Sequence, residues 1–404
     1  MSKAGFLEKL LDRADVEWLP LGEVTQYEQP TKYLVETKNY NDEFETPVLT
    51  AGKTFILGYT NEDQGIYEAS KHPVIIFDDF TTANKWVDFD FKAKSSAMKM
   101  ITSIDEGKFI LKYVFYWMNT VPSDFIDGDH KRQWISNYRN KKIPIPCPNE
   151  PEKSLAIQGE IVRILDAFTE LTAELTAELT ARKKQYNHYR DQLLTFEDGE
   201  VVHLPMGDDR VGKFTRGGGL QKKDFVEEGI GCIHYGQIYT HYGTFAHTTK
   251  TFVSEEFAKK ARMAKHGDLV IATTSETDED VCKAVAWLGD EDIAVSSDAC
   301  FYSHNLNPKY VSYFFQTEQF QKQKRPYITG AKVRRVNAHS LAKILIPIPS
   351  PEEQARIVAI LDKFDALTSS LSEGLPREIE LREKQYAYYR DLLLDFPKPK
   401  EAEA

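Results

Sequence analysis

Apolar residues recur at helical spacing over two long stretches of the chain. The first stretch, residues 152–196, contains no proline and a single glycine, Gly159. Its apolar positions follow one another in steps of three or four residues: Ile157, Ile161, Leu165, Phe168, Leu171, Leu175 and Leu179. Such steps draw one stripe along an α-helix, so the pattern predicts a helix of roughly 40 residues, about 60 Å long. A stripe of that length needs a helical partner.

The second helical stretch begins at Pro351 and can supply that partner. Its stripe consists of Ile357, Leu361, Phe364, Leu367 and Leu371. Gly374 and Pro376 are expected to break or kink the helix before residues 377–394 resume the helical pattern. We expect the two stretches to pair as a coiled coil, and antiparallel pairing is the pseudo-symmetric choice.

Short apolar runs bounded by turn residues predict strands in the rest of the chain. Residues 47–49, 74–77 and 268–272 are such runs, and Gly217–Gly219 is typical of a flexible turn. The predicted fold class is therefore α+β, with two mixed α/β domains joined by two long helices.

The whole chain is a tandem duplication with a period of about 200 residues. Five segments recur in the same order: Trp18–Gly22 as His203–Gly207, Lys112–Val114 as Lys309–Val311, Ile143–Pro146 as Ile346–Pro349, Ile161–Phe168 as Ile357–Phe364, and Lys184–Asp191 as Lys384–Asp391. A period this long indicates a duplicated domain rather than a solenoid. Two similar modules can form a pseudo-two-fold face, which suits a two-fold target or two copies of one partner.

The duplication and the helical stretches divide the chain into four regions. We expect mixed α/β domains at residues 1–145 and 198–346, a central helical spacer at residues 146–197, and a C-terminal helical region at residues 347–404. This organisation predicts a tandem repeat of domain and helix.

Composition places few further constraints on the chain. Its 404 residues leave room for two or three domains, and a hydrophobic share of 41% is ordinary for a globular protein. No apolar run is long enough to span a bilayer and the first residues do not resemble a signal peptide, so we expect a cytoplasmic protein without membrane partners. The four cysteines lack paired spacing, which favours reduced structural thiols.

The formal net charge of −11 argues at first against a lone DNA-binding domain. Two local basic clusters, each containing aromatic residues, occupy equivalent places in the two halves. The first consists of Lys131, Arg132, Arg139, Lys141 and Lys142 around Trp134 and Tyr138, and the second of Lys322, Lys324, Arg325, Lys332, Arg334 and Arg335 around Tyr327. Each cluster is either a solvated face or a set of phosphate contacts.

Further DNA-binding candidates lie outside these clusters. The basic ones are Lys92, Lys94, Lys99, Arg216, Lys222 and Lys223. His234, Tyr235, Gln237 and Tyr239 alternate along a predicted strand, where they could read base edges or face water. His234, His241 and His247 could also form a metal site, but without cysteine pairs or helical His spacing they fit polar loop positions better.

Motifs for catalysis are not apparent in the sequence. The nearest approach to the loop that holds a flipped base in an amino-methyltransferase is Asn307–Tyr310, where Lys309 stands in place of the second proline. Residues 214–219 contain glycines without the spacing of a cofactor loop, and there is no Gly-x-x-x-x-Gly-Lys phosphate cradle. We therefore expect a non-catalytic chain without a cofactor or metal of its own.

The layout resembles the specificity subunit of Type I restriction-modification systems, along essentially the whole chain. Family-like strings are Pro47–Lys53, Lys94–Lys99 and Pro351–Val358, and the Thr-Ala-Glu-Leu units within residues 171–180 are similar to repeats of the IC subgroup. The resemblance implies that each mixed domain is a target-recognition domain reading one half of a bipartite, asymmetric site in double-stranded DNA.

The resemblance also implies a role for the helices and a set of partners. The helical rod would set the spacer between half-sites and dock two methyltransferase subunits, and endonuclease/translocase subunits would join them. S-adenosylmethionine, Mg and ATP would belong to those partners. Candidates for spacing and docking are Phe168, Leu171, Leu175, Leu179, Tyr186, Phe364, Leu367, Leu371 and Tyr386.

Two other functions compete with this interpretation. A coiled-coil adaptor would use the rod for protein assembly without reading DNA, and the genes next to this one would distinguish the two. A self-sufficient enzyme is disfavoured because the motifs it needs are missing. The resemblance implies that the two recognition domains carry the part of the sequence that differs most among members of the family.

Overall fold

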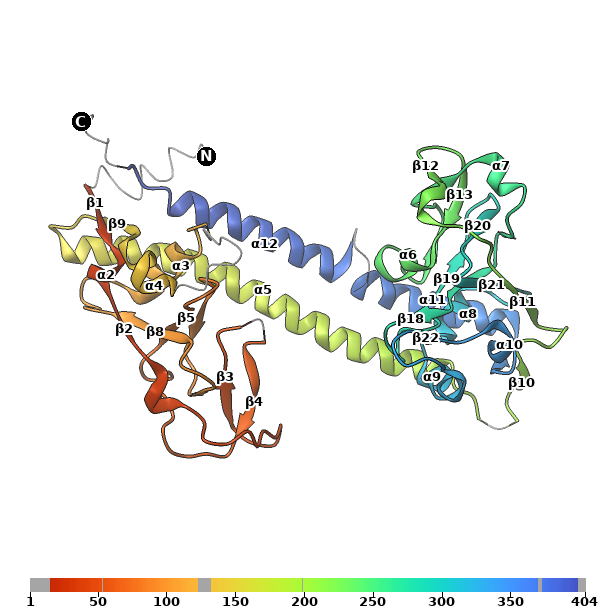
Figure 1. Cartoon of the computed structure of the whole chain (residues 1–404), viewed down its shortest axis with the longest axis horizontal. Helices are drawn as coiled ribbons and strands as arrows, with labels where there is room; N and C mark the ends of the chain where they lie inside the picture. Colours follow the sequence, from red (N-terminus) through yellow and green to blue (C-terminus); the bar gives the residue numbers. More distant parts are fainter. Residues whose placement is uncertain (1–14, 53, 123–131, 198, 370–372, 399–404) are drawn as a thin grey trace. The chain divides into compact units, whose positions relative to one another are not determined.

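The computed structural model of the chain describes residues 15–52, 54–122, 132–197, 199–369 and 373–398. The chain forms two compact units, one of Met1–Ala173 with Leu381–Ala404 and the other of Glu174–Glu380. Each unit combines one mixed α/β module with segments of both helical regions (Figure 1).

The module of the first unit is built mainly from short antiparallel strands. Its strands are β1 (Val16–Pro20), β2 (Thr25–Glu28), β3 (Thr46–Leu49), β4 (Ile56–Thr60), β5 (Val74–Asp78), β6 (Asn84–Val87), β7 (Lys92–Ala93), β8 (Met98–Ser103) and β9 (Lys142–Pro146). Its short helices are α2 (Leu21–Val24), η1 (Pro30–Tyr33), α3 (Leu111–Met118), α4 (Gln133–Ser136) and η2 (Tyr138–Asn140).

The order of the main sheet is β2-β8-β5-β6, and β3 lies between β4 and β7 in a second sheet. All five residues of β5 are buried, because both faces of this strand are covered. Ile75 and Phe77 point into the core shared with α3, whereas Val74 and Ile76 join Leu49 in a second core. This alternation is the period of two expected of a strand.

The module of the second unit carries two larger sheets. Its strands are β10 (Val202–Pro205), β11 (Gly212–Arg216), β12 (Phe225–Val226), β13 (Ile230–Ile233), β14 (Phe245–Ala246), β15 (Thr251–Val253), β16 (Met263–Ala264), β17 (Leu269–Ala272), β18 (Thr274–Ser275), β19 (Ala284–Trp287), β20 (Ile293–Val295), β21 (Ala299–His304), β22 (Arg334–Arg335) and β23 (Leu345–Ile348). Its short helices are η3 (Lys222–Asp224), α6 (Tyr235–Thr240), α7 (Glu255–Ala258), α8 (Pro308–Phe314), α9 (Glu318–Lys324), η4 (Arg325–Tyr327) and α10 (Ala338–Leu341).

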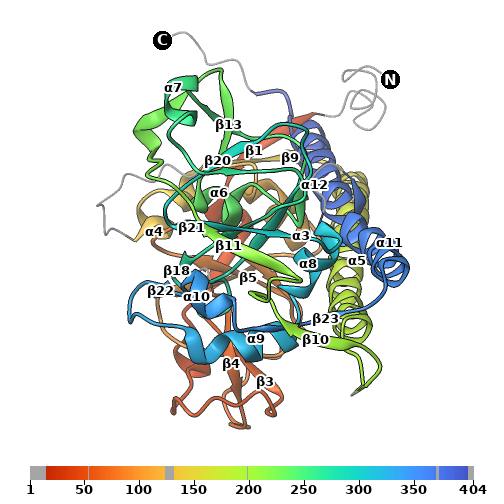
Figure 2. The ribbon, with the colours of Figure 1, turned by 90° about the vertical axis from the view of Figure 1, so that its right-hand side faces the viewer.

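The two sheets have the orders β11-β21-β17-β19-β14 and β12-β15-β13-β20-β16. In β17, Leu269 and Ile271 face one core, and Val270 and Ala272 face another. Figure 2 shows α8 between the first of these sheets and the long helices, where it covers the core that contains Leu269.

The long helices agree with the apolar stripes. Helix α5 (Pro151–Leu193) has 43 residues, and the second helical region forms α11 (Pro351–Thr368) and α12 (Gly374–Leu393). The predicted break is confirmed at Gly374, whose φ of +76° is rare for other residues. A Cβ at this position would lie 2.3 Å from the Ala366 carbonyl oxygen.

Two of the repeated segments pair with each other as strands in each copy of the duplication. Strand β1 pairs antiparallel with β9, in a register that joins Leu19 to Ile143. Strand β10 pairs with β23 in the same way and joins Leu204 to Ile346. The proline-rich segments are therefore one strand of a two-stranded ribbon in each copy, where proline is tolerated because an edge needs few donors.

Each unit takes its helical segments from both copies of the repeat. In the first unit Phe168 stacks on Tyr389, with ring centroids 5.2 Å apart. In the second unit the equivalent pair takes its tyrosine from the first copy and its phenylalanine from the second: Tyr189 stacks on Phe364, with ring centroids 5.7 Å apart. Tyr389 lies in the last turns of α12 and Phe168 in the first half of α5, so each unit by itself pairs its helical segments antiparallel.

The ends of the helical regions complete the two cores. Leu393, Leu394 and Phe396 lie in the core of the first unit beside Ile161 and Leu165. Leu194 lies in the core of the second unit beside Ile357. The predicted fold class, two mixed α/β modules with long antiparallel helices in a tandem repeat, is confirmed.

All four cysteines are buried free thiols, as predicted: Cys147, Cys232, Cys282 and Cys300. Within the described residues no helix combines the length and apolarity of a membrane span. Across those same residues no three His, Cys, Asp or Glu side chains gather closely enough to hold a metal ion.

Candidate nucleic-acid interface

The first basic cluster surrounds a buried aromatic group. Trp134 and Tyr138 are 2% and 3% exposed and pack on Phe77, with ring centroids 5.2 and 4.8 Å from it. The backbone N–H of Trp134 donates to the Asp79 carboxylate at 2.9 Å. The interleaved aromatics therefore anchor α4 and η2 to the core and are not available to stack on bases.

The basic side chains of this cluster lie on the outside of that anchor. Arg132, Arg139 and Lys142 are exposed, and Lys141 is half-buried with its Nζ 5.8 Å from the centre of the Tyr138 ring. Lys131 lies outside the described residues. The cluster therefore contributes exposed positive charge to the surface of the first module.

Exposed apolar side chains adjoin the same cluster and were missed by the sequence pattern. Tyr27, Phe80 and Ile135 are 39%, 38% and 49% exposed. Phe80 follows Asp79, Ile135 follows Trp134, and the Tyr27 ring lies 6.4 Å from the Trp134 ring. Apolar residues in strands and helices look like core residues in a sequence, so only the packing identifies them as surface. Cationic and apolar groups together suit a surface that meets phosphates and bases.

Three candidate lysines are instead part of the interior. Lys92 is 3% exposed and its Nζ lies 2.8 Å from the Glu62 carboxylate. Lys99 is fully buried, with its Nζ 3.6 Å from Asp79 and 4.8 Å from the centre of the Tyr27 ring.

The third, Lys324, donates to the carbonyl oxygens of Glu279 and Val281 at 3.0 and 2.8 Å. Burial lowers its pKa. Each of Lys92, Lys99 and Lys324 is buried, and its ammonium group lies beside partners inside the fold. We therefore do not propose these three lysines as phosphate contacts. The neighbouring candidate Lys94 is half-exposed and donates to the Tyr40 hydroxyl at 3.2 Å.

The rest of the second cluster lies on the surface of the second module. Lys322, Arg325, Lys332 and Arg335 are exposed. Lys322 is 3.8 Å from Glu318, an exposed pair of little energetic weight. Arg334 pairs with Asp278 at 2.8 Å and is half-buried, in contrast to the exposed Arg325, Lys332 and Arg335.

The strand predicted around His234 is wrong, because the segment forms helix α6 with His234 as its N-cap. The His234 ring accepts a hydrogen bond from the Gly236 N–H at 3.2 Å, and the Gln237 side chain accepts from the His234 N–H at 2.9 Å. This reciprocal capping begins a helix, and alternation in the sequence does not detect it.

The side chains at the N-terminus of α6 make local contacts within the second module. Gln237 donates to Thr251 at 3.0 Å, and Tyr235 is half-buried. Burial, followed by the nearby charge of Lys222, lowers the pKa of His234. The basic candidates near this helix are exposed, namely Arg216, Lys222 and Lys223.

A joint of four polar side chains recurs in both units and holds each module on its long helix. In the first unit the joint consists of Lys112 and Tyr116 on α3 and Asp166 and Gln158 on α5. In the second it consists of Lys309 and Tyr313 on α8 and Asp362 and Gln354 on α11. The repeated Lys-Tyr-Val string contains Lys112 and Lys309, and the repeat of Ile161–Phe168 contains Asp166 and Asp362, although the contacts between them are not visible in the sequence.

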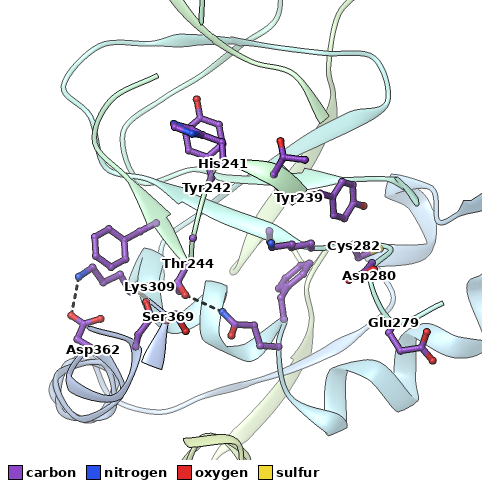
Figure 3. A pocket seen from close by; sticks show the side chains of 18 of the residues that line it. Tyr239, His241, Tyr242, Thr244, Glu279, Asp280, Cys282, Lys309, Asp362 and Ser369 are labelled. Carbon is purple, nitrogen blue, oxygen red and sulfur yellow. Dashed lines mark hydrogen bonds and ion pairs between the residues drawn. The ribbon is translucent and has the colours of Figure 1, made fainter. Parts of the chain in front are cut away.

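A cavity of about 860 Å³ lies beside the joint of the second unit. Figure 3 shows Lys309 and Asp362 at its wall, joined as an ion pair, with Thr244 nearby. Gln316 also lines the cavity, and its amide donates to the Thr244 hydroxyl at 3.2 Å. Asp365 also lines this cavity, and burial raises the pKa of its carboxyl.

Comparison with known proteins assigns the chain to a family. It matches the family described as "Type I restriction modification DNA specificity domain" over residues 14–182 and 240–381. The chain belongs to this family. It supplies DNA sequence recognition to a Type I restriction-modification complex and is not itself the catalyst, as the sequence predicted.

Two relatives of this specificity subunit match along almost their whole length. The Type I restriction enzyme EcoR124I/EcoR124II specificity subunit of Escherichia coli is 54% identical over 401 residues, covering 99% of each chain. A putative type I restriction enzyme specificity subunit of Haemophilus influenzae is 30% identical, covering 97% of this chain and 98% of the relative.

A solved structure supports the fold of the specificity subunit. The Type I restriction-modification S subunit from M. genitalium aligns with a TM-score of 0.56 at 13% identity, covering 96% of this chain and 98% of the other. The IC-like subgroup, suggested by the Thr-Ala-Glu-Leu units, stays a prediction.

The candidates for spacing and docking lie along the long helices of the specificity subunit. Phe168, Tyr186, Phe364 and Tyr386 make the ring contacts that join helices within a unit or join a helix to its module. Leu171, Leu175, Leu179 and Leu367 are half-buried, and Leu371 lies outside the described residues. Tyr388 and Leu381 on α12 are 58% and 44% exposed, and neither was among the predicted candidates.

Proposed function

We propose that each module reads one half of a bipartite, asymmetric DNA target, and that the long helices set the distance between the halves. The observation that carries this proposal is the contrast between repeated and unlike parts. The joint and the ribbons β1-β9 and β10-β23 recur in both units, whereas the strand orders of the other sheets differ between the two modules. Two modules with different surfaces, each held by an equivalent joint and ribbon, suit two different half-sites.

The repeated parts are proposed to bind two methyltransferase subunits, one per copy. A similar surface presented twice can meet two copies of one partner in equivalent ways. Endonuclease/translocase subunits would join this assembly, and the whole would act in the cytoplasm. S-adenosylmethionine, Mg and ATP would be held by these partners and not by this chain.

Phosphate and base contacts are proposed to have separate roles. The exposed cations of each module would position it on the backbone, and neighbouring polar and apolar groups would read base edges. The net charge of −11 suits a subunit with a narrow DNA footprint of its own, whose partners supply more of the positive surface.

Sequencing of modified bases tests the proposal directly. The chain is expressed with its methyltransferase subunits, and methylated adenines are mapped in their sequence context. We expect two short specific sequences at a constant separation with unread bases between them. Methylation within one contiguous motif would contradict the two-module proposal. DNA binding without any sequence preference would favour the adaptor function.

A further inference from the structure

We propose that the Lys–Tyr–Asp part of each joint fixes the orientation of its module on the long helix, and so determines how strictly the complex selects the spacer between half-sites. The inference rests on the proposed function, because it assumes two half-sites read by two modules. It assigns a positioning role to six residues: Lys112, Tyr116 and Asp166 in the first unit, and Lys309, Tyr313 and Asp362 in the second.

In the first unit one carboxylate gathers two groups from α3. The Nζ of Lys112 lies 2.9 Å from Asp166, and the Tyr116 hydroxyl donates to the same carboxylate. Lys112 and Tyr116 are four residues apart, which places both on one face of α3. The Lys112 ammonium also lies 5.3 Å from the centre of the Trp86 ring, on strand β6, so the contact links helix, sheet and spacer.

The second unit repeats this arrangement with different surroundings. The Nζ of Lys309 lies 2.8 Å from Asp362, and the Tyr313 hydroxyl donates to Asp362 at 2.7 Å. Lys309 lies 3.7 Å from the centre of the Phe245 ring, on strand β14. The same charge pair, hydroxyl and aromatic ring have therefore persisted in both copies while the sheets around them differ.

A second contact on each long helix turns the joint into a two-point attachment. The Gln158 side chain accepts from the Ile110 N–H at 2.9 Å, and the Gln354 side chain accepts from the Asn307 N–H at 2.8 Å. Each glutamine precedes the joint aspartate by eight residues (166 − 158 = 362 − 354 = 8), about 12 Å along a helix. Two points that far apart define the direction of α3 or α8 on its long helix, whereas one point leaves a pivot.

The two points differ in exposure, which makes one of them suitable for mutation. Gln158 and Gln354 are 0% and 4% exposed. The side chains of Lys112 and Asp166 are 29% and 23% exposed, and those of Lys309 and Asp362 are 21% and 32% exposed. Loss of a half-exposed pair leaves both charges within reach of water, so the module is expected to stay folded and attached through the glutamine.

Loss of orientation has a specific consequence for DNA. One base pair turns the helix by roughly 35°, so a module held rigidly meets its groove at one spacer length only. A module that pivots about the remaining glutamine contact can follow a groove displaced by one base pair. Selection of the spacer should weaken, while the bases read within each half-site stay the same.

The test measures methylation across a series of spacer lengths. Asp166→Ala and Asp362→Ala chains are each assembled with methyltransferase subunits and assayed on DNA whose spacer is one base pair shorter than, equal to, or one longer than the native length. We expect the ratio of native to altered spacing to fall at least tenfold in either variant. Single-base changes within a half-site should abolish methylation as they do for the unchanged chain.

Matched controls come from the same helices. Arg163→Ala and Arg356→Ala remove exposed ion pairs of α5 and α11, 2.7 Å from Glu160 and Glu353 respectively, without touching the joint. Both should keep the native ratio, and Lys112→Arg should keep it because the charge pair is retained. If an alanine variant does not assemble, Lys112→Gln and Lys309→Gln break the same pair with the carboxylate in place.

The outcomes separate the inference from the function on which it rests. An unchanged ratio in assembled variants, or an equal fall at every spacing, would overturn the positioning role. If the unchanged chain showed no dependence on spacing at all, the proposed two-half-site function would itself be wrong.

Discussion

At the scale of single residues, charge alone did not identify which basic side chains lie on the surface. Lys324 and Arg325 are neighbours in one basic cluster, yet Lys324 is 1% exposed and donates to two backbone carbonyls, whereas Arg325 is exposed. A buried ammonium cannot reach a phosphate without unfolding its surroundings. The exposed members of each cluster are therefore the ones to test.

Removal of two exposed cations should change the salt dependence of DNA binding. In Arg325→Ala with Arg335→Ala, each lost phosphate contact should lower the slope of log affinity against log salt by about one. The slope is measured by titration of the methyltransferase-bound complex at several salt concentrations. Lys260→Ala, which removes a highly exposed ion pair with Glu256, serves as the control. An unchanged slope would place the DNA elsewhere on the second module.

At the scale of elements, α5 is one uninterrupted helix through the Thr-Ala-Glu-Leu units. The two helical copies differ in length within this stretch. From Phe168 to Lys184 is 184 − 168 = 16 residues, and from Phe364 to Lys384 is 384 − 364 = 20. The difference equals the length of one Thr-Ala-Glu-Leu unit, so we expect the length here to change in whole units.

Insertion of one such unit after Leu179 should lengthen the unread spacer by one base pair. Four residues extend a helix by about 6 Å and rotate the remainder of the helix by roughly 40°, and one base pair turns through roughly 35°. Rotation is the stricter demand, because each module must face its groove. Mapping of methylated sites should show unchanged half-sites at the new spacing, and deletion of a unit should shorten the spacer or abolish activity. Methylation at the original spacing only would show that α5 does not set the distance.

The last residues of α12 and the segment after them are a structural part of the first module. Leu393 and Leu394 are 0% and 5% exposed within its core. Replacement of both by alanine should destabilise the first unit by about 2–5 kcal/mol per leucine, because each leaves a cavity. Tryptophan fluorescence during urea unfolding measures this, since four of the five tryptophans lie in the first unit and Trp287 alone in the second.

The repeat provides the control for that measurement. Leu193→Ala with Leu194→Ala makes the same change at the end of α5, where Leu194 lies in the core of the second unit. That pair should destabilise the second unit and leave most of the tryptophan signal unchanged. Equal effects of the two pairs on the fluorescence transition would contradict the packing of the end of α12 in the first unit and of the end of α5 in the second.

At the scale of the whole molecule, two units share one construction and differ in the surfaces they present. The joint, the ribbons and the stacked Phe–Tyr pairs occur twice, whereas the sheets do not match. A molecule of this kind can hold two unlike DNA-reading surfaces on equivalent supports. Under the proposed function, catalysis belongs to partners that bind the repeated parts.

The isolated chain is therefore expected to be inactive on DNA. Purified chain supplied with S-adenosylmethionine, or with Mg and ATP, should neither methylate nor cleave. Addition of methyltransferase subunits should restore methylation at the mapped sites. Incorporation of labelled methyl groups measures both results, and transfer by the highly purified chain alone would contradict the assignment.

The sequence by itself determined the elements whose causes are local. The stripe of Ile157, Ile161 and Leu165 predicted α5, and Gly374 predicted the break before α12, because apolar spacing and backbone freedom act over a few residues. The repeated strings also predicted the duplication and the family. The α6 helix was missed because a reciprocal cap between His234 and Gln237 outweighs alternation.

Only the tertiary structure decided which charged residues are surface and which are support. Lys92 meets Glu62 across 30 positions, Lys112 meets Asp166 across 54, and Lys324 meets the carbonyl of Glu279 across 45. The fate of a charge depends on whether folding brings it a partner and removes its water, and neither is encoded in its neighbours along the chain. The pairing of the end of α12 with the first module has the same origin, because it joins segments at opposite ends of the sequence.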